Sequence, residues 1–270
     1  MISLTKDRKM LGYEILTPYS GISCFVTTRW GGCSEGNYAT FNCTPYTGDD
    51  TECVKQNQDL LCSSLPQRPK ELIIPFQTHG VQSQVIDKKF LQASERERHI
   101  LLQDIDALIT REPGCCICIS TADCIPILLY DTEHQVVAAV HAGWRGTAAE
   151  IVGVTVRVMQ ENFGCDPQRV VAAIGPSIGK CCFEVGEEVA RVFQQLFPGN
   201  QAIVGLGKQP GKYQVDLWEA NRKELLACGV KNENIEVAGM CSVCHPDLFF
   251  SYRREGEKAG RFGAGIGMKS

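Results

Sequence analysis

Long hydrophobic runs, a basic charge excess and histidine are what this sequence has least of. Its longest apolar runs, such as Ile125–Tyr130 and Val136–Val140, are far too short to span a bilayer, so no membrane partner is expected. The net charge is -4, which disfavours nucleic acid as the main partner. The first ten residues are charged and contain no apolar stretch of signal-peptide length. We therefore expect a cytoplasmic protein.

Flexible linkers, internal repeats and low-complexity tracts are also missing. A chain of 270 residues is long enough to bury a large core without disulfides, and we expect a single domain over residues 1–270. Short β-rich segments recur along the chain, and several follow one another through turns rather than helices. This pattern predicts an α+β fold with mixed β-sheets and disfavours a regular βαβ repeat.

The expected elements are bounded by turn residues and by helix start and stop signals. The expected strands are Ile22–Thr28, Glu71–Phe76, Gln82–Asp87, Ala107–Thr110, Cys115–Ser120, Ile125–Tyr130, Val136–Val140, Val170–Ile174, Ile235–Val237 and Leu248–Tyr252. The expected helices are one opened by Asp49-Asp50, then Thr147–Asn162, Gly186–Phe197 and Asp216–Cys228. The charged run Glu95–Arg98 is expected in a solvated loop or on a helix face.

Cysteine is abundant, at 15 residues. An odd count without an export signal indicates reduced thiols, most of them acting as small core residues. The adjacent pair Cys181-Cys182 is too close for an easy bridge, and we expect one buried and one exposed thiol. The string Cys241–His245 fits the C-x-x-C-H pattern of haem attachment, but that chemistry belongs to exported proteins, so coincidence is favoured.

Two of the five histidines stand out by their positions. His79 and His141 each follow a strand-like run and lie beside glycine or alanine, whereas His99 and His134 lie in polar turns typical of the surface. Cys124 has a similar setting, in a polar corner between two strands. Two imidazoles and a thiolate suit zinc with an open fourth position. The separations of 45 and 17 residues are not short ligand spacings, so spacing alone gives weak support.

The segment His141–Thr147 also suits an anion. Two glycines and Arg145 lead into an expected helix whose first N–H groups lack partners, which predicts an anion site with Arg145 as a clamp and Thr147 at the helix start. Arg29, at the end of an expected strand, is a second candidate anion contact. For each arginine alone, a surface salt bridge is the competing interpretation.

Several long motifs in a fixed order make the sequence resemble one family. They are Phe25–Arg29 with Gly31-Gly32, Gln77–Gly80, Thr121–Cys124, His141–Thr147, Ile174–Gly179 with Cys181–Val185, and Phe249–Arg254. From about Ile22 to Arg261, the chain resembles the YfiH/YlmD-type family, whose members are labelled laccase-domain or polyphenol oxidase proteins. Two features depart from the family pattern: Gln58 replaces a common arginine, and Phe262–Gly267 is unusually rich in glycine.

The resemblance implies a metal site at His79, Cys124 and His141, and a four-layer α/β/β/α fold related to the deamidase domain of cytotoxic necrotizing factor. In that relative, a cysteine and a histidine matching Cys124 and His141 act as nucleophile and base. Family members are described as purine nucleoside enzymes that phosphorolyse adenosine, inosine and methylthioadenosine and deaminate adenosine. The implied partners are therefore purine nucleosides and phosphate.

The oxidase label can be tested by counting ligands. A conventional multicopper oxidase needs many more histidines than five, and no His-x-His string is present, so that class is excluded. A single copper ion in the zinc site, as in a copper-dependent polyphenol oxidase, stays an alternative because Cu²⁺ outcompetes Zn²⁺ at most such sites.

The leading hypothesis is a zinc-dependent purine nucleoside enzyme. Zinc at the three ligands would lower the pKa of a water towards ~7, with Asp123 as the nearest carboxylate to carry protons. Arg29, Arg145 and Thr147 are the candidates to hold phosphate. One alternative is a metal-free cysteine hydrolase acting on amides or peptidoglycan precursors through Cys124 and His141. Another is a non-catalytic protein that stores metal or buffers redox state.

Overall fold

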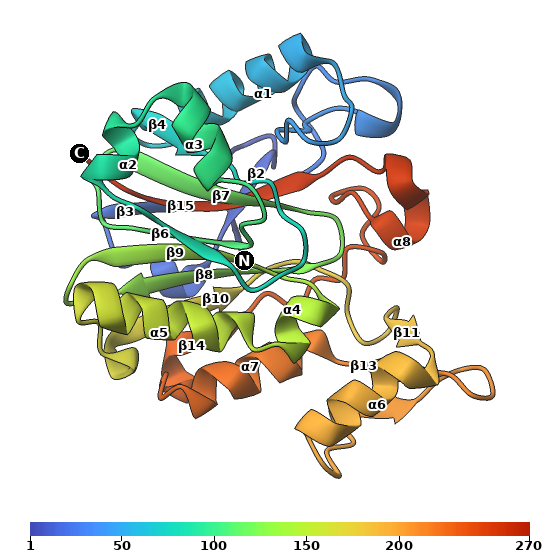
Figure 1. Cartoon of the computed structure of the whole chain (residues 1–270). Helices are drawn as coiled ribbons and strands as arrows, with labels where there is room; N and C mark the ends of the chain where they lie inside the picture. The colour runs from blue at the N-terminus through green and yellow to red at the C-terminus, as the bar shows by residue number, and fades with distance from the viewer.

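Two six-stranded β-sheets lie face to face, with helices on both outer sides, in the computed structural model, which describes all 270 residues (Figure 1). The first sheet has the strand order β1-β2-β3-β15-β7-β4, and the second has the order β14-β10-β8-β9-β6-β5. Helix α1 covers the outer face of the first sheet, and α5 and α7 cover that of the second. The expected α+β fold, built as a single domain in α/β/β/α layers, is confirmed.

The elements have the following bounds. The strands are β1 (Ile2–Ser3), β2 (Met10–Gly12), β3 (Ile22–Thr27), β4 (Glu71–Ile73), β5 (Ser83–Ile86), β6 (Ala107–Thr110), β7 (Cys115–Thr121), β8 (Ile125–Asp131), β9 (Val136–Ala142), β10 (Val170–Ile174), β11 (Glu184–Val185), β12 (Val204–Leu206), β13 (Tyr213–Val215), β14 (Ile235–Val237) and β15 (Phe262–Met268). The helices are α1 (Thr51–Ser64), α2 (Lys88–Gln92), α3 (Glu95–Leu101), α4 (Trp144–Ala148), α5 (Ile151–Phe163), α6 (Glu187–Leu196), α7 (Leu217–Ala227) and α8 (Tyr252–Glu255). None of these helices combines the length and the apolar character needed to cross a membrane.

Alternating side chains of the central strands fill two separate cores. In β8, Ile127 and Leu129 pack with Met159 of α5, whereas Leu128 and Tyr130 lie in the core between the two sheets. Both faces of these strands are therefore buried. This is why β8 and β9 have nearly continuous apolar sequences instead of an apolar and polar alternation.

Strand β15 lies in the middle of the first sheet, between β3 and β7, although its sequence is rich in glycine. Its apolar residues, such as Phe262 and Ile266, enter the core between the sheets. Its glycines face the other side, where a Cβ on Gly265 would collide with the ring of Phe25. Glycine weakens the usual strand signal, so the sequence predicted no strand here.

Two predicted elements differ from the structure. The expected strand Leu248–Tyr252 is wrong: Phe249 and Phe250 enter the core from an irregular segment, and α8 begins at Tyr252. The expected helix Thr147–Asn162 is two helices, because Glu150 between α4 and α5 adopts a left-handed φ of 58°.

Other helix starts follow their capping signals. The Asp50 side chain accepts a hydrogen bond from the Cys53 N–H at 2.9 Å, which confirms the predicted start of α1. The charged run after Ser94 forms α3, since Ser94 and Glu97 make a reciprocal capping box there.

A small lobe projects from one side of the two large sheets (Figure 1). It consists of the three-stranded sheet β11-β13-β12 and helix α6. The lobe lies at the same end of the molecule as α4 and α8 (Figure 1), and this end carries the site described next.

Candidate active site

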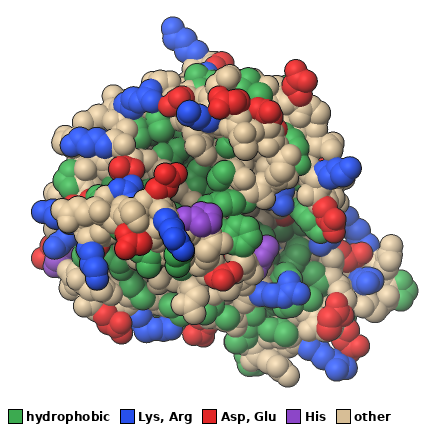
Figure 2. Space-filling model, turned by 45° about the horizontal axis from the view of Figure 1, so that its top comes forward, with side chains coloured by type: hydrophobic (Ala, Val, Ile, Leu, Met, Phe, Trp, Pro, Cys, Tyr) green, Lys and Arg blue, Asp and Glu red, His purple; other side chains and the backbone are tan.

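A cavity of about 730 Å³ opens between the large sheets and the lobe. Figure 2 shows this face hollowed, with a histidine side chain beside the hollow. Five aromatic side chains line the cavity: Tyr46, Phe76, Trp144, Phe183 and Tyr252. The volume lies within the range of sites for small molecules, and aromatic walls suit a flat ring system.

Three predicted ligands meet in this cavity. His79 comes from the loop between β4 and β5, Cys124 from the turn between β7 and β8, and His141 from β9. Their ligand atoms all lie within 4.8 Å of one another. Antiparallel pairing of β8 with β9 places Pro126 opposite His141, so the pairing closes the sequence gap between Cys124 and His141. The structure thus brings together all three residues of the predicted metal site.

A buried carboxylate that the sequence did not single out orients both histidines. Oδ1 of Asp106 lies 2.8 Å from Nδ1 of His141 and also accepts the backbone N–H of His79 at 3.0 Å. Oδ2 accepts the N–H of Gly80 at 2.6 Å. Burial raises the pKa of Asp106, but the hydrogen bond and charge of His141 and the backbone N–H groups of Gly80 and Thr78 together outweigh it, and the net pKa is lowered. Because Nδ1 of His141 is held, its Nε2 is left for a metal.

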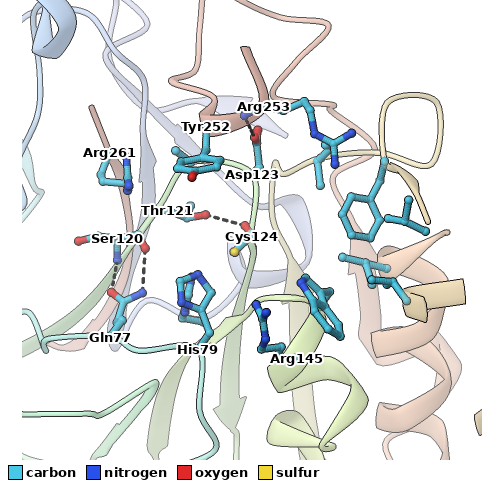
Figure 3. Close-up of a pocket in the computed structure, with 18 of the residues that line it drawn as sticks. Gln77, His79, Ser120, Thr121, Asp123, Cys124, Arg145, Tyr252, Arg253 and Arg261 are labelled. Carbon is cyan, nitrogen blue, oxygen red and sulfur yellow. Dashed lines mark hydrogen bonds between the residues drawn. The ribbon is translucent and has the colours of Figure 1, made fainter. Parts of the chain in front are cut away.

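Gln77 fixes the His79 loop from the other side. Its amide donates to the Ser120 carbonyl at 2.9 Å and accepts the Ser120 N–H at 2.8 Å (Figure 3). His79 itself has a left-handed φ of 63°, which is uncommon for a residue other than glycine. Such a conformation persists where surrounding contacts determine it, and here Gln77 and Asp106 hold the backbone on both sides.

Cys124 and His141 shift each other's ionisation. Burial raises the pKa of the Cys124 thiol, but the charge of His141 and hydrogen bonds from both imidazoles lower it to about 6. Burial lowers the pKa of His141, but the Cys124 thiolate and Asp106 raise it to about 9. A thiolate therefore exists at neutral pH, and the thiolate is both the metal-binding and the nucleophilic form of cysteine.

The donor set and the space around it fit a zinc ion with one open position. Two imidazoles and one thiolate are a ligand set of catalytic zinc sites. The site is also kept clear by Gly143, where a Cβ would lie 2.9 Å from Cδ2 of His79 and 3.1 Å from Sγ of Cys124. Any larger residue at position 143 would crowd two of the three ligands.

Asp123, the predicted proton carrier, lies in the cavity wall with its carboxylate fully engaged. It accepts hydrogen bonds from Ser242 Oγ at 2.5 Å, Ser251 Oγ at 3.1 Å and the Arg253 N–H at 2.6 Å. Figure 3 shows it pointing towards Arg253 and away from His79. These bonds favour a positioning role, and proton transfer by Asp123 stays a prediction.

The three predicted phosphate contacts have different surroundings. Arg145 lines the cavity, stacks on Trp144 at 4.3 Å and makes no ion pair (Figure 3). Arg29 lies outside the cavity lining, because it pairs with Glu255 at 2.8 Å and covers the ring of Phe250. The structure gives no support to a phosphate contact by Arg29.

Thr147 is buried within α4 and faces the neighbouring helix. Its Oγ1 accepts a hydrogen bond from Asn221 of α7 at 3.0 Å, and it does not line the cavity. The helix begins at Trp144, three residues earlier than predicted, so Thr147 lies within the helix and not at its start. Thr147 therefore joins two helices, and a phosphate contact by its side chain has no support here.

Three cavity residues from the C-terminal segment had no predicted role. Tyr252 and Arg261 lie across the cavity from His79, and Arg253 lies beside Asp123 (Figure 3). Arg253 donates to the carbonyls of Cys182 at 3.0 Å and Glu184 at 3.2 Å, so it ties α8 to the lobe. Burial lowers the pKa of Arg261. The motif Phe249–Arg254 was the only sequence signal for this wall.

Residues 23–269 match the family described as "Multi-copper polyphenol oxidoreductase laccase". The chain belongs to this family. It is 54% identical to a "Purine nucleoside phosphorylase" of Bacteroides thetaiotaomicron, with 98% of each chain covered. It is 39% identical to "Adenosine deaminase RL5" of an unknown prokaryotic organism, over 92% of this chain and 95% of the relative. The crystal structure of YlmD from Geobacillus stearothermophilus superimposes with a TM-score of 0.86 at 34% identity, over 94% of both chains. These matches confirm the resemblance seen in the motifs.

Proposed function

We propose that this protein is a zinc-dependent purine nucleoside enzyme, which phosphorolyses adenosine, inosine and methylthioadenosine and also deaminates adenosine. The observation that carries the proposal is the convergence of His79, Cys124 and His141 around Asp106, in a cavity of small-molecule size. The names of the two relatives, a purine nucleoside phosphorylase and an adenosine deaminase, support the substrate class.

His79, Cys124 and His141 would hold the zinc ion. When bound, zinc supplies a Lewis acid that polarises an oxygen of the attacking water or phosphate. Copper is the alternative occupant, because the same donors bind it. Asp106 orients His141 and the His79 backbone, so its contribution is to hold these two ligands in position before substrate binds.

The cavity walls supply the substrate contacts. Phe76, Trp144 and Tyr252 offer faces on which a purine ring stacks, and stacking of this kind tolerates different purines. Arg145 has no carboxylate partner, so its guanidinium is available for two parallel hydrogen bonds to phosphate. In phosphorolysis, a phosphate oxygen bonds to C1′ of the ribose as the C1′–N9 bond breaks, and the departing purine takes up a proton.

All fifteen cysteines are free, seven of them buried, which fits a reducing compartment. On this basis we place the enzyme in the cytoplasm. Purine nucleosides and phosphate are its proposed small-molecule partners.

The test compares zinc content and turnover in the wild type and His79→Ala, both purified without added metal. We expect His79→Ala to lose one zinc per chain together with both nucleoside activities. The control is His99→Ala, in α3 and outside the cavity, which should keep both. A His79→Ala enzyme with wild-type turnover would overturn the metal-dependent mechanism.

One observation favours a second candidate, a metal-free cysteine hydrolase. The pKa of Cys124 is lowered to about 6, and His141 and Asp106 complete a nucleophile, base and orienting group. In metal-free protein, alkylation of Cys124 should therefore be half-maximal near pH 6. The rate should fall as the pH drops below that value, since the thiolate is then protonated.

Mass spectrometry of the Cys124 adduct measures this profile, with zinc-loaded protein as the control that resists alkylation. A midpoint near the ordinary thiol value of 9.0 would contradict the lowered pKa. Amide hydrolysis by the metal-free protein, abolished by alkylation, would favour the hydrolase over the nucleoside enzyme.

A further inference from the structure

Four cysteine side chains from two distant segments meet outside the cavity. Cys181 and Cys182 lie just before β11, and Cys241 and Cys244 lie between β14 and α8. Their four Sγ atoms are all within 4.8 Å of one another. None of them is shared with the group formed by His79, Cys124 and His141.

The spacing of the sulfur atoms is compatible with four ligands around one zinc ion. Sγ of Cys244 lies 3.5 Å from Sγ of Cys182 and 3.7 Å from Sγ of Cys181. In a tetrahedron with Zn–S bonds of about 2.3 Å, the sulfur atoms are about 3.8 Å apart. A disulfide would require a separation of about 2.0 Å. The thiols are therefore close enough to share one metal ion and too far apart to be bonded to one another.

The backbone around Cys241 is arranged to favour a thiolate. The N–H of Gly179 donates to Sγ of Cys241 at 3.3 Å, and the N–H groups of Val243 and Cys244 also point at this sulfur. Hydrogen bonds of this kind favour the charged form of a buried sulfur. Donors directed at a ligand sulfur are the usual outer contacts of a thiolate metal centre.

A divalent cation at the centre of the cluster would bind all four sulfur atoms as thiolates, because a coordinated thiol loses its proton outright. Cys181 and Cys244 are exposed, so an ion can enter from solvent.

We propose that Cys181, Cys182, Cys241 and Cys244 bind a second, structural zinc ion. Four thiolates leave no open coordination position, so this site holds structure and does no chemistry. Zinc is the metal of choice for a closed tetrahedral site of four sulfurs that needs no redox partner.

The four-cysteine site lies between two segments that help to form the cavity. Cys181 and Cys182 directly precede Phe183–Val185, which form the lobe side of the cavity. The turn Cys241–Cys244 contains Ser242, whose hydroxyl bonds to Asp123 beside Cys124. A zinc ion here would join the lobe to the segment leading into α8, and so would fix the position of Phe183–Val185 relative to Asp123.

The decisive experiment counts zinc per chain in full-length protein purified without added metal. We expect two in the wild type, one in Cys244→Ser, one in His79→Ala and none in the double variant. Cys33→Ser, at an exposed cysteine outside the cluster, is the matched control and should keep two. This proposal can be tested separately from the proposed function. Cys244→Ser reports on the four-cysteine site, whereas His79→Ala reports on the site in the cavity.

Cobalt gives a spectroscopic check. After exchange with Co²⁺, His79→Ala should keep the intense sulfur-to-metal absorption of a four-thiolate site, and Cys244→Ser should lose it. Wild-type zinc content in Cys244→Ser would overturn the proposal. So would a stable disulfide within the cluster in the native wild-type protein, or iron in place of zinc.

A measurement on the wild type covers the case in which Cys244→Ser fails to fold. Cys181 and Cys244 should resist an alkylating reagent in native protein, despite their exposure, and should react after a chelator is added. Equal reactivity before and after chelation would rule out a metal at this site.

Discussion

A single buried carboxylate determines where both histidines of the active site lie. Asp106→Asn keeps the size of the side chain but removes the charge that Nδ1 of His141 meets. We expect the affinity for the zinc that His79 binds to fall about 10–100-fold, as is typical for the loss of such a contact. Competition with a chromophoric chelator measures the change. Asp104→Asn, at an exposed neighbouring position, should leave the affinity unchanged. Equal affinities in both variants would remove Asp106 from this role.

Arg145 is a second single residue whose role can be tested by substitution. Because it lines the cavity without an ion-pair partner, Arg145→Ala should raise the KM for phosphate about 10–100-fold, which corresponds to one or two lost charged hydrogen bonds. Zinc content and the KM for adenosine in deamination should change little. Initial rates at varied phosphate measure the effect, and Arg191→Ala, on the surface of α6, is the control. A KM for phosphate equal to that of the control would assign the anion to another residue.

The sequence predicted the three metal ligands but not the carboxylate of Asp106 that orients two of them. His79 and His141 could be selected because each follows a strand-like run beside small residues, and Cys124 because it lies in a polar corner between two strands. Asp106 is one aspartate among many before a strand, and only strand pairing brings it to His141. The cluster of four cysteines was not predicted either. Some 60 residues separate Cys181-Cys182 from Cys241 and Cys244, and the string Cys241–His245 was compared only with haem attachment.

Among the strands and helices, β15 needs glycine because a side chain at Gly265 would collide with the ring of Phe25. Gly265→Ala would place a methyl group against the ring of Phe25 in the middle of the first sheet. We expect a loss of about 1–3 kcal/mol in the free energy of unfolding, which is typical of overpacking. Urea denaturation measures it. Gly21→Ala is the control, because no atom lies within 4 Å of its added Cβ, and it should change stability by much less. Equal stability of the two variants would show that Phe25 moves aside without cost.

Helix and strand positions were predicted best where the local signal was strong. Asp50 and Gly186 mark the starts of α1 and α6 as expected. The break at Glu150 could not be foreseen, since glutamate is a good helix former and nothing in the local sequence signals its left-handed φ of 58°. Tertiary contacts override helix propensity at Glu150. Tertiary contacts also explain the position of Thr147, which bonds to Asn221 of α7 and does not line the cavity.

At the scale of the whole molecule, the lobe and the large sheets differ in stability. Strands β11, β12 and β13 have two or three residues each and are partly exposed, whereas every residue of β8 and β9 is buried. We expect lobe amides to exchange with solvent through openings of lower free energy than those of β8 and β9. Native-state hydrogen exchange with mass spectrometry compares residues 184–215 with residues 125–142. Equal protection of the two regions would contradict the expected difference.

The position of β15 also has a consequence for the order in which the chain is made. Residues 262–268 are the last strand in chain order, yet both β3 and β7 pair with them. Until residues 262–268 have been made, the edges of β3 and β7 that pair with this strand have no native partner. Open edges are sites of aggregation, so chains stalled before residue 262 should depend on chaperones far more than completed ones.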